Sequence, residues 1–267
     1  GEKGDPFVAF PDFHPDADYL VYSQGITPLD FGSFSQEEAR LDLFTLKVQP
    51  KDKTPKTEGQ AQGSLLSSDF KKKDIPQLEP SFSPSGNEVV FTGIDRGNYD
   101  IYKMTVLPTI DYQSGSIGGF NIVTDGVKRL TDMPTPEGQP CWSPDGSMIA
   151  FLSGKEQQKN EWGLWVMDAD GTNQHKLVDR VLNQDFPEWH PTSRQIFFVK
   201  VWEEEMNPIQ YVDVRTGKIG TLETGTALHT HLDISQDGRK IAFCAKGRMT
   251  DRNLTWLKLY TAGLVSR

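Results

Sequence analysis

The sequence is poor in the residues that would indicate several classes of protein. Only two cysteines, Cys141 and Cys244, occur among 267 residues, which is too few for a disulfide framework or a cysteine-based zinc motif. Both lie inside apolar segments, and we interpret them as small buried hydrophobic side chains. No segment reaches the roughly 18 consecutive apolar residues that a spanning helix requires, so no membrane span is expected.

Positive charge is also in the minority. Lysine and arginine number 28 against 37 aspartate and glutamate residues, a net charge of −9, whereas nucleic-acid binding relies on a clustered basic surface. We therefore expect no nucleic-acid partner. No G-x-S-x-G nucleophile motif is present. The sequence shows no signal peptide and begins with Gly1 in place of Met, which we interpret as a processed or engineered start from which an export signal was removed.

Turn-forming and aromatic residues, by contrast, are abundant. The 24 glycines and 17 prolines, with 15 Phe, 7 Tyr and 6 Trp, suit many short strands separated by turns. The segment QPCWSPDGSMIAFLSG (139–154) recurs in altered form in four other places. The five copies align on a turn position occupied by Pro15, Pro84, Pro144, Pro191 and Gln236. A repeat of this regularity determines the fold prediction.

Each copy of the repeat has the chemistry of a β-hairpin. In the third copy Pro144 presets φ, Asp145 can bond its own backbone, and Gly146 takes the left-handed position without steric cost. The strand after the turn is apolar on both faces and is therefore predicted to be buried on both. Third strands are expected at 41–46, 99–104, 163–168, 209–214 and 256–260, and fourth strands at 128–131, 175–178 and 219–222.

These strands predict an all-β protein built from four-stranded antiparallel blades. One blade cannot bury both of its apolar faces alone, so blades must stack side by side around an axis as a β-propeller. We predict a single domain over residues 1–267 with five blades at approximately 5–70, 75–132, 136–179, 183–223 and 228–267. The insertions at 49–63 and 107–121 are interpreted as long surface loops and as candidates for a binding surface.

The segment QPCWSPDGSMIAFLSG…GLWVMDADGTNQHKLV (139–178) is similar to the repeat of TolB-like β-propellers, in which a PxWSPDGxxIAF hairpin precedes an IYxMxxDG strand and turn. The resemblance implies the propeller fold. Proteins with this repeat include periplasmic scaffold and binding proteins, propeller gates of serine peptidases, and a branch of pectin-fragment lyases. Such propellers usually have six blades, whereas five can be counted here; a degenerate or missing sixth blade is the alternative.

The propeller fold predicts where a ligand site would lie. The first strand of each blade lines the central channel, so residues five and seven positions before the turn position are expected near the channel mouth. From the polar members of these two sets we predict six ligand-binding residues: Glu79, Glu137, Gln139, Gln184, His229 and His231.

Two histidines of this set could chelate a divalent metal. His229 and His231 are two apart on an extended segment and are expected to project on the same side. They resemble the His-x-His of oligogalacturonate-type lyases, although Thr226 stands where that family has a further Gln. The interpretation we favour is two histidines bonded to water in a polar channel mouth. Two other histidines, His14 and His190, precede the turn proline and are predicted to cap the turn.

Two functions remain open on these residues. The leading hypothesis is a non-catalytic, TolB-like binding or scaffold propeller of the bacterial cell envelope, periplasmic by resemblance, which engages a protein or small ligand at the channel mouth without a cofactor. The alternative is a metal-dependent lyase that acts on acidic oligosaccharides through His229 and His231.

Overall fold

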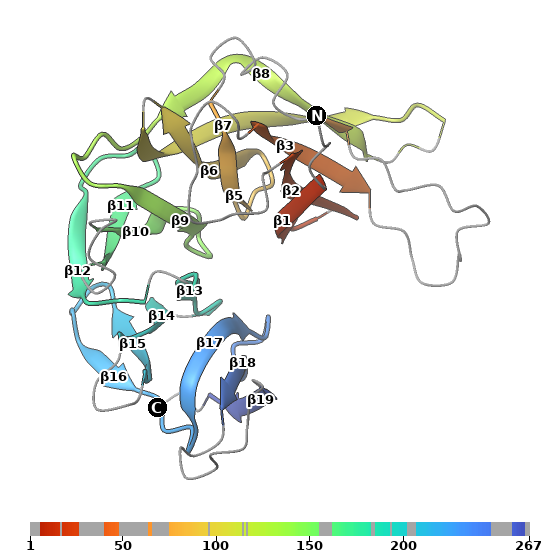
Figure 1. Ribbon diagram of the computed structural model, residues 1–267. Helices are drawn as coiled ribbons and strands as arrows, with labels where there is room; N and C mark the ends of the chain where they lie inside the picture. Colours follow the sequence, from red (N-terminus) through yellow and green to blue (C-terminus); the bar gives the residue numbers. More distant parts are fainter. Residues whose placement is uncertain are drawn as a thin grey trace. The chain divides into compact units, whose positions relative to one another are not determined.

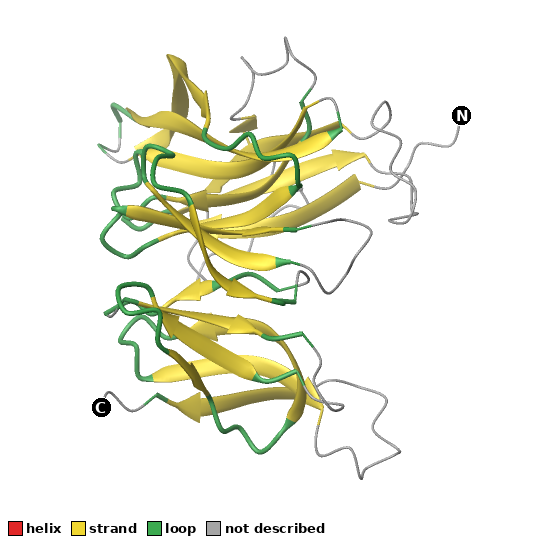
Figure 2. Cartoon of the chain, turned by 90° about the vertical axis from the view of Figure 1, so that its left-hand side faces the viewer, coloured by secondary structure: helices red, strands yellow, loops and turns green. Residues whose placement is uncertain are grey.

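The computed structural model describes the protein at residues 6–16, 18–26, 40–47, 64–65, 75–95, 97–113, 115, 117–154, 162–182, 185–192, 194–201, 207–246 and 258–264. Strands, joined by turns, are the regular structure of these ranges (Figure 2). Within them there is no helix of the length and apolarity needed to cross a membrane. The predicted all-β class is confirmed.

The described strands form five antiparallel sheets, each made of strands that are consecutive in the sequence (Figure 1). The first sheet contains β1 (Pro6–Phe13), β2 (Tyr19–Ile26), β3 (Arg40–Lys47) and β4 (Ser64–Leu65), and the second contains β5 (Gln77–Phe82), β6 (Glu88–Asp95), β7 (Asn98–Ile110) and β8 (Ile117–Arg129). The third contains β9 (Glu137–Trp142), β10 (Met148–Ser153), β11 (Gly163–Asp168) and β12 (His175–Asp179), and the fourth contains β13 (Glu188–Trp189), β14 (Gln195–Val199), β15 (Ile209–Asp213) and β16 (Ile219–Thr221). The fifth contains β17 (Ala227–Ile234), β18 (Lys240–Lys246) and β19 (Lys258–Gly263).

These sheets are the blades that the repeat predicts, and we number them as blades 1 to 5. The strands of blades 1 to 4 lie inside the ranges given for those blades, and β17 of blade 5 begins at Ala227, one residue before the expected start at 228. Blade 5 has three strands among the described residues, against the four that were expected. The chain divides into two compact units, Gly1–Pro134 with blades 1 and 2 and Thr135–Arg267 with blades 3 to 5.

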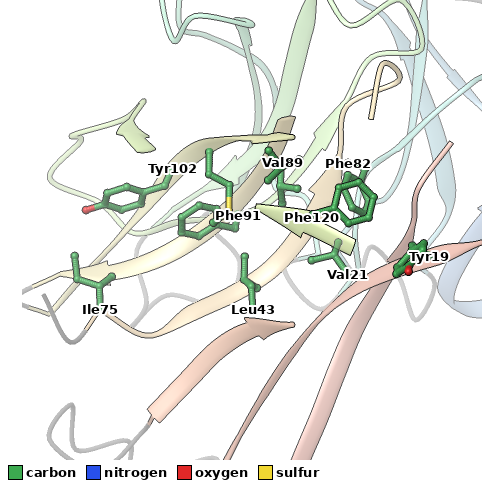
Figure 3. Packing of buried hydrophobic residues seen from close by; sticks show 11 residues of the cluster. Tyr19, Val21, Leu43, Ile75, Phe82, Val89, Phe91, Tyr102 and Phe120 are labelled. Carbon is green, nitrogen blue, oxygen red and sulfur yellow. The ribbon is translucent and has the colours of Figure 1, made fainter. Parts of the chain in front are cut away.

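The second strand of each blade supplies most of the core, as its apolar pattern predicts. In β6 the six residues from Val89 to Ile94 are all buried, and in β10 the same holds from Ile149 to Ser153. A strand buried on both faces must be covered by side chains from two directions. In the first unit, Val89 and Phe91 pack with Leu43 of blade 1 in one cluster (Figure 3). Blades 1 and 2 therefore share a core.

The insertion at 107–121 is not a loop, and that prediction is wrong. Strands β7 and β8 continue past the rest of blade 2 as a hairpin whose ladder includes the pairs Leu107↔Asn121 and Ile110↔Ile117. The hairpin is held to the protein because Phe120, 9% exposed, packs into the core of the first unit, with Ile117 and Ile122 against the same cluster. The other insertion, 49–63, lies outside the described residues.

The two cysteines are both free and half-buried. The Cys141 thiol donates a hydrogen bond to the carbonyl oxygen of Pro187 at 3.0 Å, and the indole N–H of Trp189 donates to the Cys141 carbonyl at 3.3 Å. Cys141 thus connects the first strands of blades 3 and 4. At the repeat-equivalent position in blade 1, a carboxylate oxygen of Asp12 accepts a hydrogen bond from the Phe82 N–H of blade 2 at 2.7 Å.

Candidate binding site on the first strands

The first strand of four blades carries the same β-bulge. The register shifts between Ala9 and Asp12 in β1, between Leu78 and Ser81 in β5, and between Thr230 and Asp233 in β17. A shift of the same size interrupts the pairing of β9 with β10. In each case one residue at the bulge adopts a left-handed backbone, namely Phe10 (φ 55°), Glu79 (54°), Gln139 (55°) and His231 (55°).

A left-handed backbone at a non-glycine residue is strained, by on the order of 1–3 kcal/mol. Three of the four residues also precede a proline, which normally holds its predecessor in an extended conformation. Their conformation is therefore imposed by the packing of the blade. A bulge re-aims the side chain that carries it, and these four residues stand five positions before the turn position, where the sequence predicts a ligand site.

A buried aromatic side chain faces each bulge from the second strand. The bulged pair Glu79 and Pro80 lies opposite Phe91, and Gln139 with Pro140 lies opposite Phe151. His231 with Leu232 lies opposite Phe243 in the same way. Phe91 and Phe151 have no exposed surface and Phe243 only 2%. The aromatic core and the bulge thus form one repeated structural unit.

The predicted ligand-binding residues lie in different environments. In the first unit, Glu79 is half-buried and accepts a hydrogen bond from the Thr92 hydroxyl of β6 at 2.8 Å. In the second unit, Glu137 is fully buried on β9 and Gln139 is 9% exposed. Gln184 lies outside the described residues. Glu137 and Gln139 therefore sit at the base of the bulge, below the exposed surface.

His229 is buried and fully engaged by the protein. The carbonyl oxygen of Asn207 lies 2.7 Å from Nδ1, and the hydroxyls of Thr224 and Thr226 lie 2.7 and 3.0 Å from Nε2. The Asn207 side chain also accepts from the His229 N–H and donates to its carbonyl oxygen, at 2.7 and 2.8 Å. Because a carbonyl can only accept, Nδ1 carries the proton and Nε2 accepts from the Thr224 hydroxyl, while the Thr226 hydroxyl donates to Thr224 at 2.9 Å.

His231, in contrast, is exposed and pairs with a buried carboxylate. Its backbone N–H donates to Oδ1 of Asp185 at 2.6 Å, and Asp185 is only 3% exposed. Nδ1 of its ring lies 2.8 Å from the Thr230 hydroxyl. The second oxygen, Oδ2, has no hydrogen-bond partner. Burial raises the pKa of Asp185, and the backbone hydrogen bond and the charge of His231 offset part of that rise. The exposed imidazole and the buried acid form a polar anchor at the bulge of blade 5.

The expectation that the two histidines project on the same side assumed a regular strand. A second register shift, between Ala227 and Thr230, precedes the bulge of blade 5, and Leu228 also has a left-handed φ of 55°. The alternation of side chains between the two faces of β17 is therefore interrupted both before and after His229. A metal at Nε2 of His229 would have to displace two hydroxyl partners, and the described residues contain no group of three or more potential metal ligands.

The predicted turn-capping role of His14 and His190 is confirmed. Nδ1 of His14 accepts from the Asp16 N–H at 3.1 Å, and Nδ1 of His190 accepts from the Thr192 N–H at 3.3 Å. The sequence did not indicate the second role of these rings. Nε2 of His190 lies 2.9 Å from the carbonyl oxygen of Gly238, which belongs to the turn of the next blade. Each histidine therefore ties the turns of two consecutive blades together.

Asp185 and Asn207 are the functional candidates that sequence reasoning missed. Asp185 accepts a hydrogen bond from His231, 46 positions away, and Asn207 accepts one from His229, 22 positions away. No local sequence pattern predicts such contacts. The bulges did leave a signal. A proline stands four positions before the turn position in four copies, at Pro11, Pro80, Pro140 and Pro187, and proline within a strand is confined to edge strands and bulges. Three of these prolines, Pro11, Pro80 and Pro140, lie in the described bulges.

The buried state of His229 predicts a pH dependence of stability. Burial lowers the pKa of His229, and the hydrogen bond to Asn207 opposes this only in part. The unfolded chain, with an ordinary histidine pKa near 6.5, then binds a proton more readily than the folded chain. The free energy of unfolding should therefore fall as the pH drops below about 6.5, by at most about 1.4 kcal/mol per pH unit.

Urea unfolding at about pH 7.5 and about pH 5.5 measures this effect. The His229→Gln variant should show a smaller difference between the two pH values than the wild type, whatever its absolute stability. His175→Gln, which changes an exposed ring, should keep the wild-type difference. An unchanged difference in His229→Gln would show that another group, such as His14, dominates the titration.

Comparison with known proteins places this geometry in context. No family model matches the sequence. An uncharacterized peptidase of Bacillus subtilis, YuxL, is 22% identical over 222 residues, which cover 70% of this chain and 32% of that protein. Dipeptidyl-peptidase 5 of Porphyromonas gingivalis is 36% identical over 173 residues, which cover 61% of this chain and 25% of that protein. The chain thus spans about a third or less of the length of these two relatives.

Solved structures resemble nearly the whole chain. A protein of Agrobacterium tumefaciens assigned as TolB matches with a TM-score of 0.62 and 15% identity, over 97% of this chain and 77% of that one. Puromycin hydrolase matches with a TM-score of 0.61 and 15% identity, over 97% of this chain and 36% of the enzyme. At identities this low the likeness concerns the fold alone.

Proposed function

Because the chain has the β-propeller fold of TolB-like proteins, we propose that it is a non-catalytic binding propeller of the bacterial cell envelope. It would engage a protein segment or small ligand at the polar side chains of its first strands. The envelope location follows from the resemblance to TolB, which the chain shares in its repeat and its fold. The absence of a G-x-S-x-G motif from the sequence supports a binding role for this part of the chain.

The observation that carries the proposal is the anchor formed by His231 and Asp185. Strained backbone persists only where the surrounding structure enforces it, and such sites cluster where ligands bind. Here the buried Asp185 holds the backbone N–H of His231 at the strained bulge, and the imidazole of His231 is exposed. The exposed imidazole can donate a hydrogen bond to a partner or accept one from it.

A second candidate function is the propeller domain of a serine peptidase. The specific observation in its favour is the 36% identity with dipeptidyl-peptidase 5, which is higher than the identity with either of the matched solved structures. In that case the same first-strand surface would contact peptide substrate on its way to a hydrolase domain encoded elsewhere in the full gene product. Both candidates place binding on the first strands and differ in whether the complete protein cleaves peptides.

Photo-crosslinking tests the binding surface. A p-benzoylphenylalanine introduced in place of His231 should give a discrete, light-dependent adduct in cell-envelope extracts, because the side chain at this bulge is exposed. The matched control places the same amino acid at Lys218, an exposed position on the turn between β15 and β16. Equal adducts at both positions, or none at His231, would contradict the proposal.

A cleavage assay separates the two candidates. Purified residues 1–267 should release no p-nitroaniline from dipeptidyl p-nitroanilides under the binding proposal, and cleavage by this chain itself would overturn it. The product of the complete coding region is then assayed in the same way. Cleavage by that longer protein, together with inactivity of residues 1–267, would assign the propeller to a peptidase.

A further inference from the structure

A cleft lies between the hairpin turns of blades 3 and 4, inside the second unit. It has a volume of about 530 Å³. Its floor is apolar, formed by Met148 of blade 3 with Trp189 and Val214 of blade 4, and its rim carries Arg194 and Arg215. Ser143, Pro144, Asp145, Ser147, Pro191 and Thr192 complete the lining. The cleft is separate from the bulges of the first strands on which the proposed function rests.

In the first unit the equivalent place is filled by an aromatic side chain. Phe120, on the hairpin extension formed by β7 and β8, packs between the turns of blades 1 and 2 (Figure 3). Its ring centroid lies 5.4 Å from that of Tyr19 and 5.8 Å from that of Phe82. The His14 ring lies at 5.1 Å. The extension is further held by a hydrogen bond from the Tyr19 hydroxyl to the Ile117 carbonyl at 3.3 Å.

The residues around Phe120 and those of the open cleft occupy the same repeat positions. Tyr19 and Met148 each stand four positions after the turn proline, and Phe82 and Trp189 each stand two positions before it. The third equivalent pair is Val106 and Val214, which make the same backbone hydrogen bond in their blades. The Val106 N–H donates to the Asn87 carbonyl at 2.8 Å, and the Val214 N–H donates to the Arg194 carbonyl at 3.0 Å.

The chain after Val106 differs from the chain after Val214. This difference explains why the space between the turns of blades 1 and 2 is filled while the cleft between the turns of blades 3 and 4 is open. In blade 2 the third strand runs on past Val106 into the extension that carries Phe120. In blade 4 the strand ends at Asp213, whose carboxylate accepts from the Thr216 N–H and hydroxyl in a tight turn. Blade 4 therefore has the receiving surface without the hairpin that would cover it.

The rim of the open cleft carries two arginines at positions where blade 2 has uncharged residues. Arg194 replaces Asn87, and Arg215 follows Val214 where Leu107 follows Val106. The nearby carboxylate of Asp145 is already occupied, since it accepts hydrogen bonds from the Ser143 and Ser147 hydroxyls at 2.7 Å each. Arg194 interacts electrostatically with Asp145, and Arg215 with Asp213, but neither guanidinium is paired with a carboxylate at 4 Å or less among the described residues. Each can therefore still form a close ion pair with an external carboxylate.

We propose that this cleft binds an extended segment of a partner protein that inserts a phenylalanine or tyrosine over Met148 and Trp189 and places an adjacent carboxylate against Arg194 and Arg215. The aromatic ring repeats in trans the packing that Phe120 makes within the chain. The carboxylate supplies the charge complementarity that makes the segment prefer this cleft.

The hairpin of the chain itself provides the probe. The acetylated and amidated peptide Ile-Gly-Gly-Phe-Asp-Ile-Val has the sequence of residues 117–123 with aspartate in place of Asn121. Isothermal titration calorimetry on the full chain measures its binding. Replacing the phenylalanine of the peptide by alanine should weaken binding at least about tenfold. Replacing its aspartate by asparagine should weaken binding about twofold to fivefold, and less at high salt.

Variants of the protein locate the site. The double variant Arg194→Ala with Arg215→Ala changes only exposed side chains, and it should weaken the aspartate peptide by the same factor of about twofold to fivefold while leaving the asparagine peptide unchanged. Lys218→Ala, an exposed cation outside the cleft, should bind both peptides as the wild type does. Equal binding of the phenylalanine and alanine peptides, wild-type affinity in the double arginine variant, or no binding at all would overturn the proposal.

Self-association is the competing occupant, because Asp111 and the fully exposed Tyr112 form an acidic and aromatic pair at the tip of the β7–β8 hairpin. Light scattering after gel filtration tests this directly. Self-association that is abolished both by Tyr112→Ser and by the double arginine variant would assign the cleft to a second copy of the chain and overturn the proposal of a separate partner. A monomer at all concentrations supports the separate partner.

Discussion

Gly238→Ala is expected to lower the free energy of unfolding by about 2–5 kcal/mol. Gly238 has a φ of +68°, where a side chain is strained, and an added Cβ would lie 2.5 Å from Cε1 and 2.9 Å from Nε2 of His190. The ring cannot move away without losing its contact with the Gly238 carbonyl oxygen and its hydrogen bond from Thr192. Chemical denaturation of the purified variant measures the loss.

A matched control separates backbone strain from collision with the histidine. Gly217 has nearly the same φ, +69°, but an added Cβ would meet nothing within 4 Å, so Gly217→Ala should cost only about 1–2 kcal/mol. Combining Gly238→Ala with His190→Ser should restore part of the stability that the glycine substitution removes. Equal losses in the two alanine variants, or additive effects in the double variant, would show that His190 is not wedged against the turn.

Phe91→Ala is the second substitution with a large expected effect, a loss of about 3–5 kcal/mol in the free energy of unfolding. Phe91 has no exposed surface and lies opposite the bulged pair Glu79 and Pro80. It also stacks on Tyr102 with ring centroids 5.7 Å apart. Removing the ring takes away the packing that holds Glu79 in its left-handed conformation, so the variant should lose both core packing and the bulge geometry.

Phe13→Ala is the control, because Phe13 is in the same unit but 63% exposed. Its effect should stay within about 0.5 kcal/mol. Hydrogen exchange of the β5 and β6 amides tests the link to the bulge, since Phe91→Ala should lower protection there more than in β7 and β8. A loss of stability with uniform changes in protection would mean that Phe91 supports the blade as a whole and has no special relation to the bulge.

The repeat made the blades predictable because the interactions that define them are local. The proline, aspartate and glycine of the turn at Pro144 determine the hairpin within four residues, and alternating or continuous apolar residues determine which strands are buried. The turn-capping roles of His14 and His190 were predictable for the same reason, since each ring bonds an amide two residues away. The blade order and the all-β class follow from these short-range patterns.

Other features depend on residues far apart in the sequence and appeared only in the tertiary structure. The insertion at 107–121 is rich in glycine and was predicted as a loop, but Phe120 finds its place against Tyr19 and Phe82 and keeps the hairpin paired. The positive φ of Glu79 or His231 cannot be deduced from residue type, because it results from packing of one strand against the next. At Glu79 the following proline, Pro80, was its only trace in the sequence, and at His231, which precedes Leu232, there was none.

The candidate site, too, was predictable only in part from the sequence. The sequence by itself determined that polar side chains recur before the turn in four of the five repeats. This was possible because a residue's position in the repeat determines its position in the blade. Only the tertiary structure decided that His229 is buried against Asn207 and that His231 is exposed beside Asp185. The physical reason is that a side chain's exposure and hydrogen bonds depend on partners brought in from other blades, which a strand's own sequence does not encode.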